Sequence, residues 1–110
     1  MVRDLCGLGE IGDGLEVQVD GPDGPVFIAL FRLAGDVHAY LNACPHLGRS
    51  LSLAPDEFCV GDDGRLLCPH HGACFELATG KCVSGPCVGD SLKRLEVEIA
   101  GDRVLLREPG

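Results

Sequence analysis

Short apolar runs rich in Val, Leu, Ile and Phe recur along the chain, and Gly, Pro and Asp separate them. Runs of this kind, bounded by turn residues, are typical of β-strands. Near the C-terminus Leu95, Val97 and Ile99 alternate with two glutamates, which predicts a strand with one buried face and one wet face. The expected strands are residues 15–20, 26–33, 37–41, 65–68, 73–77, 92–99 and 103–107.

Turn-forming residues stand between these runs. The turn segments are residues 21–24, 34–36, 62–64, 78–80 and 100–102, and each contains Gly. The last of them predicts a β-hairpin that joins the two C-terminal strands. The pattern contains no long helix, internal repeat or domain boundary, so we predict a single all-β domain of antiparallel sheets spanning residues 1–110.

Composition narrows the function classes. The chain has 110 residues and a formal charge of −8, and it lacks the clustered Lys and Arg that nucleic acids or anionic membranes require. An acidic surface would instead suit a basic docking face on another protein. No apolar stretch reaches 18 residues, and the first 20 residues contain charged side chains instead of an apolar signal core, so we expect a soluble, cytoplasmic protein. Seven Cys, an odd number, then indicate reduced thiols and metal ligands rather than a disulfide framework.

Two short motifs pair a thiol with an imidazole: Cys44-Pro45-His46 and Cys68-Pro69-His70-His71. They predict a metal site built in two halves, on Pro- and Gly-rich loops at strand ends. Two Cys and two His suit a structural zinc ion, and they also suit a [2Fe–2S] cluster in which His replaces Cys on one iron. Spacing leaves open whether His70 or His71 is the second imidazole ligand, although the short Cys-x-His spacing counts against zinc.

The two motifs resemble those of Rieske iron–sulfur proteins. The likeness includes Gly48 after the first motif, Gly72-Ala73 and Phe75 after the second, and Gly85-Pro86 in a third loop. In that family the ligands are Cys-x-His and Cys-x-x-His, so the resemblance implies that Cys44, His46, Cys68 and His71 hold one [2Fe–2S] cluster. It also implies a Rieske-type fold, with a small cluster-binding part at about residues 42–88 formed by loops.

The small Rieske-type ferredoxins are the most similar members in length. The resemblance therefore implies an electron carrier and not an enzyme, passing one electron at a time from a flavin-dependent reductase to a terminal oxygenase such as an aromatic-ring dioxygenase. We expect a monomer that binds protein redox partners, with no nucleic acid and no membrane. One departure is that the segment between the motifs is a few residues longer than usual, around residues 54–63.

The resemblance also predicts a low reduction potential. Two His ligands leave the oxidised centre neutral, which places Rieske potentials in the range of roughly −150 to +300 mV. High-potential members add a Cys pair and two hydroxyls near the cluster. Here Arg49, His70, Ala73 and Phe75 stand at those positions, so we predict a value near the low end, about −150 mV.

Three alternatives stay open. Within the same fold, the alternative role is the small subunit of a nitrite reductase; outside it, the alternatives are a structural zinc-binding interaction module and a redox sensor. The remaining cysteines have no ligand spacing and are interpreted as apolar filler, and a disulfide between Cys74 and Cys82 is not expected. His38 is interpreted as a surface strand residue. The filler interpretation covers Cys6, Cys59, Cys74, Cys82 and Cys87.

Overall fold

The described residues form three antiparallel sheets and one short 3₁₀ helix. The computed structural model describes residues 2–12, 14–22, 24–33, 35–43, 58–61, 64–68, 72–85 and 88–107. The first sheet is β1 (Val2–Gly7), β11 (Arg103–Arg107) and β10 (Val97–Ala100), and the second is β2 (Leu15–Gly21), β3 (Gly24–Leu33), β4 (Asp36–Leu41) and β9 (Arg94–Leu95). The third is β5 (Cys59–Val60), β6 (Arg65–Leu67), β7 (Cys74–Glu76) and β8 (Cys82–Ser84).

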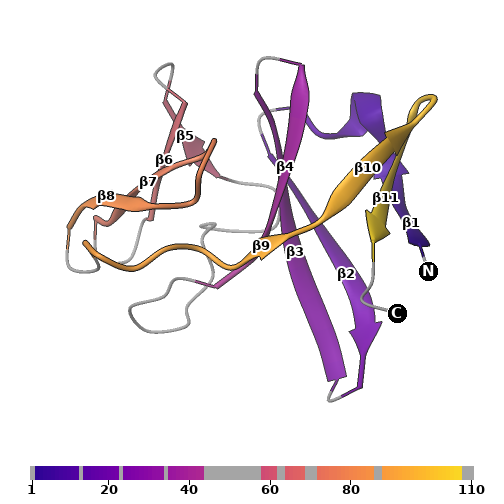
Figure 1. Cartoon of the computed structure of the whole chain (residues 1–110), viewed down its shortest axis with the longest axis horizontal. Coiled ribbons are helices and arrows are strands. Elements are labelled where there is room, and N and C mark those ends of the chain that lie inside the picture. Colours follow the sequence, from indigo (N-terminus) through magenta and orange to yellow (C-terminus); the bar gives the residue numbers. More distant parts are fainter. Residues whose placement is uncertain are drawn as a thin grey trace.

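The second sheet is the middle layer of the molecule (Figure 1). Four consecutive residues of β3, Ile28 to Phe31, are buried, because each face of this strand packs against a different neighbour. Ile28 and Leu30 join a core with Val104 and Leu106 of the first sheet. Ala29 and Phe31 face the third sheet and join a second core, which we call the junction core; its other buried members are Tyr40, Leu66, Cys68, Ala73, Phe75, Leu77, Cys82 and Leu92.

The predicted turns at residues 21–24, 34–36 and 100–102 lie where the pattern placed them. The β2–β3 and β3–β4 hairpins close at Gly21↔Gly24 and Leu33↔Asp36. The last hairpin closes at Ala100↔Arg103, with Gly101 at φ +62° in the left-handed region that glycine adopts without strain. The prediction of an all-β fold of antiparallel sheets is confirmed. In the described part of the chain, no helix is long and apolar enough to cross a membrane.

The expected single strand 92–99 is wrong, because it consists of two strands in different sheets. Leu95 of β9 pairs with Ala39 in the middle sheet, whereas Val97 of β10 pairs with Leu106 in the first sheet. Glu96 lies between them, and its carbonyl accepts a hydrogen bond of 2.9 Å from the amide of Arg107. The alternation therefore hid a crossover, and Ile99, expected to be buried, is 43% exposed.

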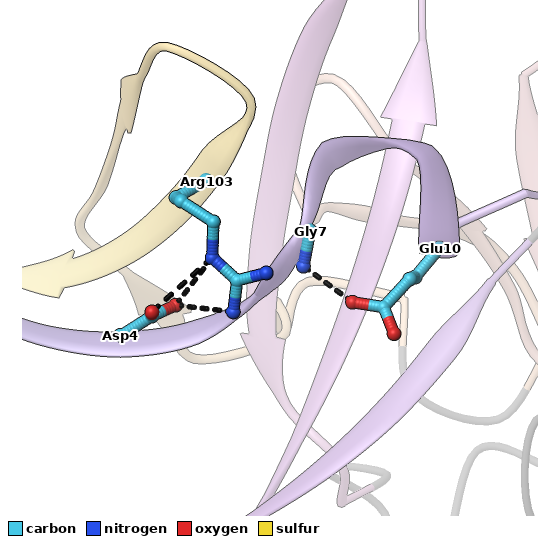
Figure 2. A network of polar contacts seen from close by, with 4 residues as sticks. All are labelled: Asp4, Gly7, Glu10 and Arg103. Carbon is cyan, nitrogen blue, oxygen red and sulfur yellow. Dashed lines mark hydrogen bonds and ion pairs between the residues drawn. The ribbon is translucent and has the colours of Figure 1, made fainter.

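Three strands and the 3₁₀ helix η1 (Leu8–Glu10) were not expected from the sequence: β1, β5 and β8. In β1 the charged pair Arg3 and Asp4 interrupts the apolar pattern, although the strand pairs along its length with β11. Figure 2 shows how this edge is fixed: the Arg103 guanidinium binds the Asp4 carboxylate at 2.9–3.2 Å, and the Glu10 carboxylate accepts the Gly7 amide. The N-terminal and C-terminal strands are thus joined.

Candidate metal centre

Cys68 is the predicted ligand that the structure describes. It follows β6 directly, is fully buried, and belongs to the junction core. The other three predicted ligands, Cys44, His46 and His71, lie outside the described residues, as do His70 and Arg49. The ligand set of four therefore stays a prediction, and the described residues that flank each motif show how the ends of the motifs are held.

Two backbone hydrogen bonds fix both ends of the second motif. The Cys68 amide donates to the Ala73 carbonyl at 2.7 Å, and the Gly72 amide donates to the Cys68 carbonyl at 3.1 Å. Gly72 has φ +70°, a conformation that costs a residue with a Cβ about 1–3 kcal/mol. Strands β6 and β7 continue the pairing at Leu67↔Cys74. The chain therefore leaves and re-enters the third sheet at one point, which holds the ends of this motif together.

The first motif begins directly after β4. The Asn42 amide donates to the Phe27 carbonyl at 2.9 Å, and its buried side chain donates to the Glu16 carboxylate on β2. The Ala43 amide donates to the Leu41 carbonyl at 2.8 Å. These contacts anchor the chain up to the residue before Cys44. Sequence reasoning missed Asn42, since nothing in the pattern pairs it with a glutamate 26 residues away.

The third loop touches the second motif. A Cβ on Gly85 would lie 2.7 Å from the Cα of Ala73, closer than real Cβ atoms approach backbone, and 3.1 Å from the Gly72 carbonyl oxygen. Gly85 also has φ +96°. This contact places the third loop against the residues that follow the second motif, while Pro86 and Cys87 fall outside the described residues. The two loops are packed backbone against backbone, and that requires glycine.

The described surroundings of Cys68 are apolar. Ala73 and Phe75 are fully buried in the same core and bring no hydroxyl, and the hydroxyl of Tyr40 donates to the Leu77 carbonyl. A buried sulfur at the end of a rigid hairpin fits a thiolate ligand of iron or zinc. Such an environment shields a metal centre from water, and neither Ala73 nor Phe75 offers it a hydroxyl.

The cysteines without ligand spacing divide into buried and exposed positions. Cys6 and Cys82 are buried, as the filler interpretation expects, but Cys59 is exposed and Cys74 is half-buried, so that interpretation is wrong for Cys59. Desolvation is the main reason that the pKa of the Cys6 thiol is raised.

Cys74 pairs with Ser84 and Phe75 pairs with Cys82, so Cys74 and Cys82 do not face each other. Among the described residues no group of three metal-ligating side chains forms elsewhere.

A comparison with protein families decides what kind of centre this is. Residues 4–100 match the model of the Rieske [2Fe-2S] domain. The chain belongs to the Rieske family. The expected [2Fe–2S] cluster is therefore confirmed as the cofactor of this domain, and the alternative of a structural zinc ion is excluded.

Curated relatives of this Rieske domain include both ferredoxins and a much longer protein. This chain is 32% identical to the 3-phenylpropionate/cinnamic acid dioxygenase ferredoxin subunit of Escherichia coli K12, over 94% of this chain and 91% of that protein. It is 34% identical to apoptosis-inducing factor 3 of Mus musculus over 94% of this chain, but it spans 16% of that protein's length. Because the chain spans 16% of that longer relative, the expected role of an electron-transfer component rather than an enzyme is a proposal for the whole protein.

Solved structures show the same fold. The Sphingomonas yanoikuyae B1 ferredoxin superimposes with a TM-score of 0.76 at 27% identity, covering 99% of this chain and 100% of that one. A chain from the complex of reduced oxygenase and oxidized ferredoxin in carbazole 1,9a-dioxygenase gives a TM-score of 0.73 at 26% identity, covering 96% and 91%. A nitrite reductase small subunit from Mycobacterium tuberculosis, described as NADH-dependent and not yet verified in function, gives 0.73 at 26%, covering 100% and 96%.

Proposed function

We propose that this Rieske domain is a monomeric, cytoplasmic one-electron carrier that passes electrons from a flavin-dependent reductase to a terminal oxygenase of the aromatic-ring dioxygenase type. The observation that carries the proposal is the end-to-end match with a dioxygenase ferredoxin subunit, 94% of this chain against 91% of that one. A match of this extent supports the same role for a single domain of residues 1–110, with its cluster-binding part at about 42–88.

We assign the cluster to Cys44, His46, Cys68 and His71. When bound, the cluster supplies a site that gains and loses one electron. The chain's own contribution is to hold the ligands still, because a rigid, dry surrounding keeps the rearrangement on electron transfer small. The buried Cys68 and the contact between Gly85 and Ala73 support that part. The imidazoles of His46 and His71 are the proposed exit for the electron.

The protein surroundings also bear on the potential. Hydrogen bonds to cluster sulfur stabilise the reduced, more negative form. Ala73 and Phe75 supply no hydroxyl, and both are fully buried beside Cys68. This supports a potential near the low end of the Rieske range, about −150 mV, which suits delivery of electrons to an oxygenase. The charge of −8 supports docking against basic faces of both partners.

The ligand assignment is tested by two adjacent substitutions. His71→Ala should remove the visible absorption of the cluster and the rhombic EPR signal of the reduced protein, whereas the matched variant His70→Ala should keep both. The reverse result would overturn the assignment of His71. A colourless protein that binds one zinc per chain would end the cluster assignment altogether.

The role is tested by reconstitution. The native carrier should support NADH-dependent turnover of a ring-hydroxylating oxygenase when a flavin-dependent reductase is added, and turnover should stop when the carrier is left out. A second candidate role, as the small subunit of a nitrite reductase, is favoured by the structural match at a TM-score of 0.73. Oxidation of the reduced carrier by a nitrite reductase large subunit, and not by the oxygenase, would establish that second role.

A further inference from the structure

One arginine joins the middle sheet to the third sheet. Arg94 on β9 lies opposite Tyr40 on β4, and its guanidinium makes contacts on both sides of the junction. Nη1 donates to the Ala78 carbonyl at 3.2 Å and lies 3.4 Å from the Tyr40 hydroxyl. Nη2 lies 3.4 Å from Nδ1 of His38. We call this set of contacts the Arg94 bridge.

The bridge and Tyr40 grip the same turn. Tyr40 donates its hydroxyl to the Leu77 carbonyl, and a Cβ on Gly80 would lie 2.8 Å from the Tyr40 ring. The Leu92 amide donates to the Gly80 carbonyl at 2.7 Å. Residues 77–80, which we call the far turn, are therefore held from β4 and from the segment before β9.

The far turn and the cluster ligand Cys68 lie at opposite ends of β7. Leu77 is four residues from Ala73, about 13 Å along a strand at ~3.3 Å per residue. Strand β7 is hydrogen-bonded to β6 on one side and β8 on the other, so it moves as a rigid segment. Since the Ala73 carbonyl accepts the Cys68 amide, the position of the far turn determines where the second motif lies.

His38 is the part of the bridge that changes with pH. Among the described residues, three groups face His38. They are the Arg94 guanidinium from β9, the Asp36 carboxylate from its own strand, and the uncharged Phe31 from β3. On the far side of the bridge, the Glu76 carboxylate of β7 interacts electrostatically with Tyr40. A neutral His38 whose Nδ1 is unprotonated accepts from Nη2 of Arg94. An imidazolium has no such lone pair and repels the guanidinium.

We propose that Arg94 is a positioning residue for the second ligand motif, and that protonation of His38 loosens its hold on the far turn. Burial, and then the nearby guanidinium, lower the pKa of His38 from its usual 6.5, while Asp36 raises it less. Because the pKa of His38 is lower in the folded protein than in the unfolded chain, the contact between His38 and Arg94 is at full strength above pH 6.5. It is lost as the pH falls through the lower folded value.

Hydrogen exchange on the cluster-loaded protein tests this proposal. The amides of Gly80 and Leu92 report the far turn, and the paired amides of β10 and β11 serve as an internal reference. After correction for intrinsic exchange rates, protection of Gly80 and Leu92 relative to the reference should fall between pH 8 and pH 5. The expected fall is about two- to fivefold, the range of one exposed charged contact. A constant ratio would overturn the proposal.

Three variants separate titration from general loosening. His38→Asn keeps an acceptor at the Nδ1 position that does not titrate, so its ratio should stay at the high-pH native value throughout. Arg94→Lys keeps the charge but not the fork of donors, so its ratio should be low at every pH. The matched control Arg103→Lys, in the first sheet, should behave as the native protein. Persistence of the pH dependence in His38→Asn would also overturn the proposal, whichever redox partner the carrier serves.

Discussion

The amide of Cys68 donates a hydrogen bond of 2.7 Å to the carbonyl of Ala73. That amide is engaged within the hairpin and cannot also donate to a sulfur atom of the cluster. Among the described residues that follow it, the nearest buried side chains are Ala73 and Phe75, and they carry no hydroxyl. The second motif is therefore held firmly by a bond that gives the reduced cluster no stabilisation.

The first prediction concerns the reduction potential. Phe75→Tyr places a hydroxyl in the junction core beside Cys68, where a hydrogen bond to sulfur would stabilise the reduced form and raise the midpoint potential. Protein-film voltammetry or a dye-mediated titration measures the shift. Phe31→Tyr is the control, because Phe31 is buried in the same core but comes from β3. An equal shift in both variants, or a native midpoint well above zero, would contradict the argument.

The second prediction concerns the backbone contact of the third loop. Gly85→Ala forces a Cβ to within 2.7 Å of Ala73 in addition to straining a residue at φ +96°. Gly89→Ala is a matched control, since Gly89 has φ +101° and nothing within 4 Å of the added atom. We expect the control to lose about 1 kcal/mol and Gly85→Ala to lose about 1–3 kcal/mol more, with faster cluster loss. Urea denaturation and the decay of visible absorption measure these two effects.

The third prediction concerns the buried hydroxyl at the junction. Tyr40→Phe removes the donor and leaves the Leu77 carbonyl without this hydrogen bond in a core where Tyr40 is fully buried. The free energy of unfolding should therefore fall by about 1–3 kcal/mol. The control is Thr79→Ala, which removes an exposed contact of 3.3 Å to Glu76 in the same turn. It should change the stability by about 0.5 kcal/mol or less. Similar losses in both variants would show that the hydroxyl has no special role.

The fourth prediction concerns pH and the thiols. Burial raises the pKa of the Cys6 thiol above its usual 9.0, so the native state holds this proton longer than the unfolded state does. Its contribution to stability is complete below pH 9 and is lost as the pH rises through the higher folded value. The urea midpoint should therefore fall in alkali, and Cys6→Ala should reduce that slope.

Alkylation gives an independent reading of the same thiol. Iodoacetamide should label the exposed Cys59 well before Cys6, and peptide mapping by mass spectrometry identifies each site. Cys59→Ser should remove the fast phase and leave the labelling of Cys6 unchanged. Fast labelling of Cys6 in the folded protein would contradict its burial.

The pattern of the sequence predicted those parts of the fold that local rules determine. The hairpins that close at Gly21↔Gly24 and Ala100↔Arg103 follow from turn residues between apolar runs. The crossover at Glu96 could not be predicted, since alternation continues through it while the pairing partner changes from one sheet to another. β1 was missed because it contains charged residues, one of which, Asp4, binds Arg103 on the paired strand β11, 99 residues away.

The site was predictable to a different degree. The two Cys/His motifs, with Cys68 as one of the donors, follow from residue type and spacing, but the choice of His71 over His70 rests on family resemblance. The burial of Cys68 is known only from the fold. Arg94 and Tyr40 carried no signal in the sequence, because their contacts with the far turn exist only once the two sheets pack together. Contacts of that kind depend on tertiary structure and not on local pattern.

The pairing of β1 with β11 also determines the order in which the molecule can be completed. The strands of the third sheet lie between residues 59 and 84, so their pairing partners leave the ribosome close together in time. The first sheet needs Val2 to find Arg107, and it stays incomplete until the last strand has been synthesised. Contacts so distant in sequence form slowly. We therefore expect the hairpins that carry the second motif to form before β1 pairs with β11, so that synthesis itself favours early assembly of the metal-binding part.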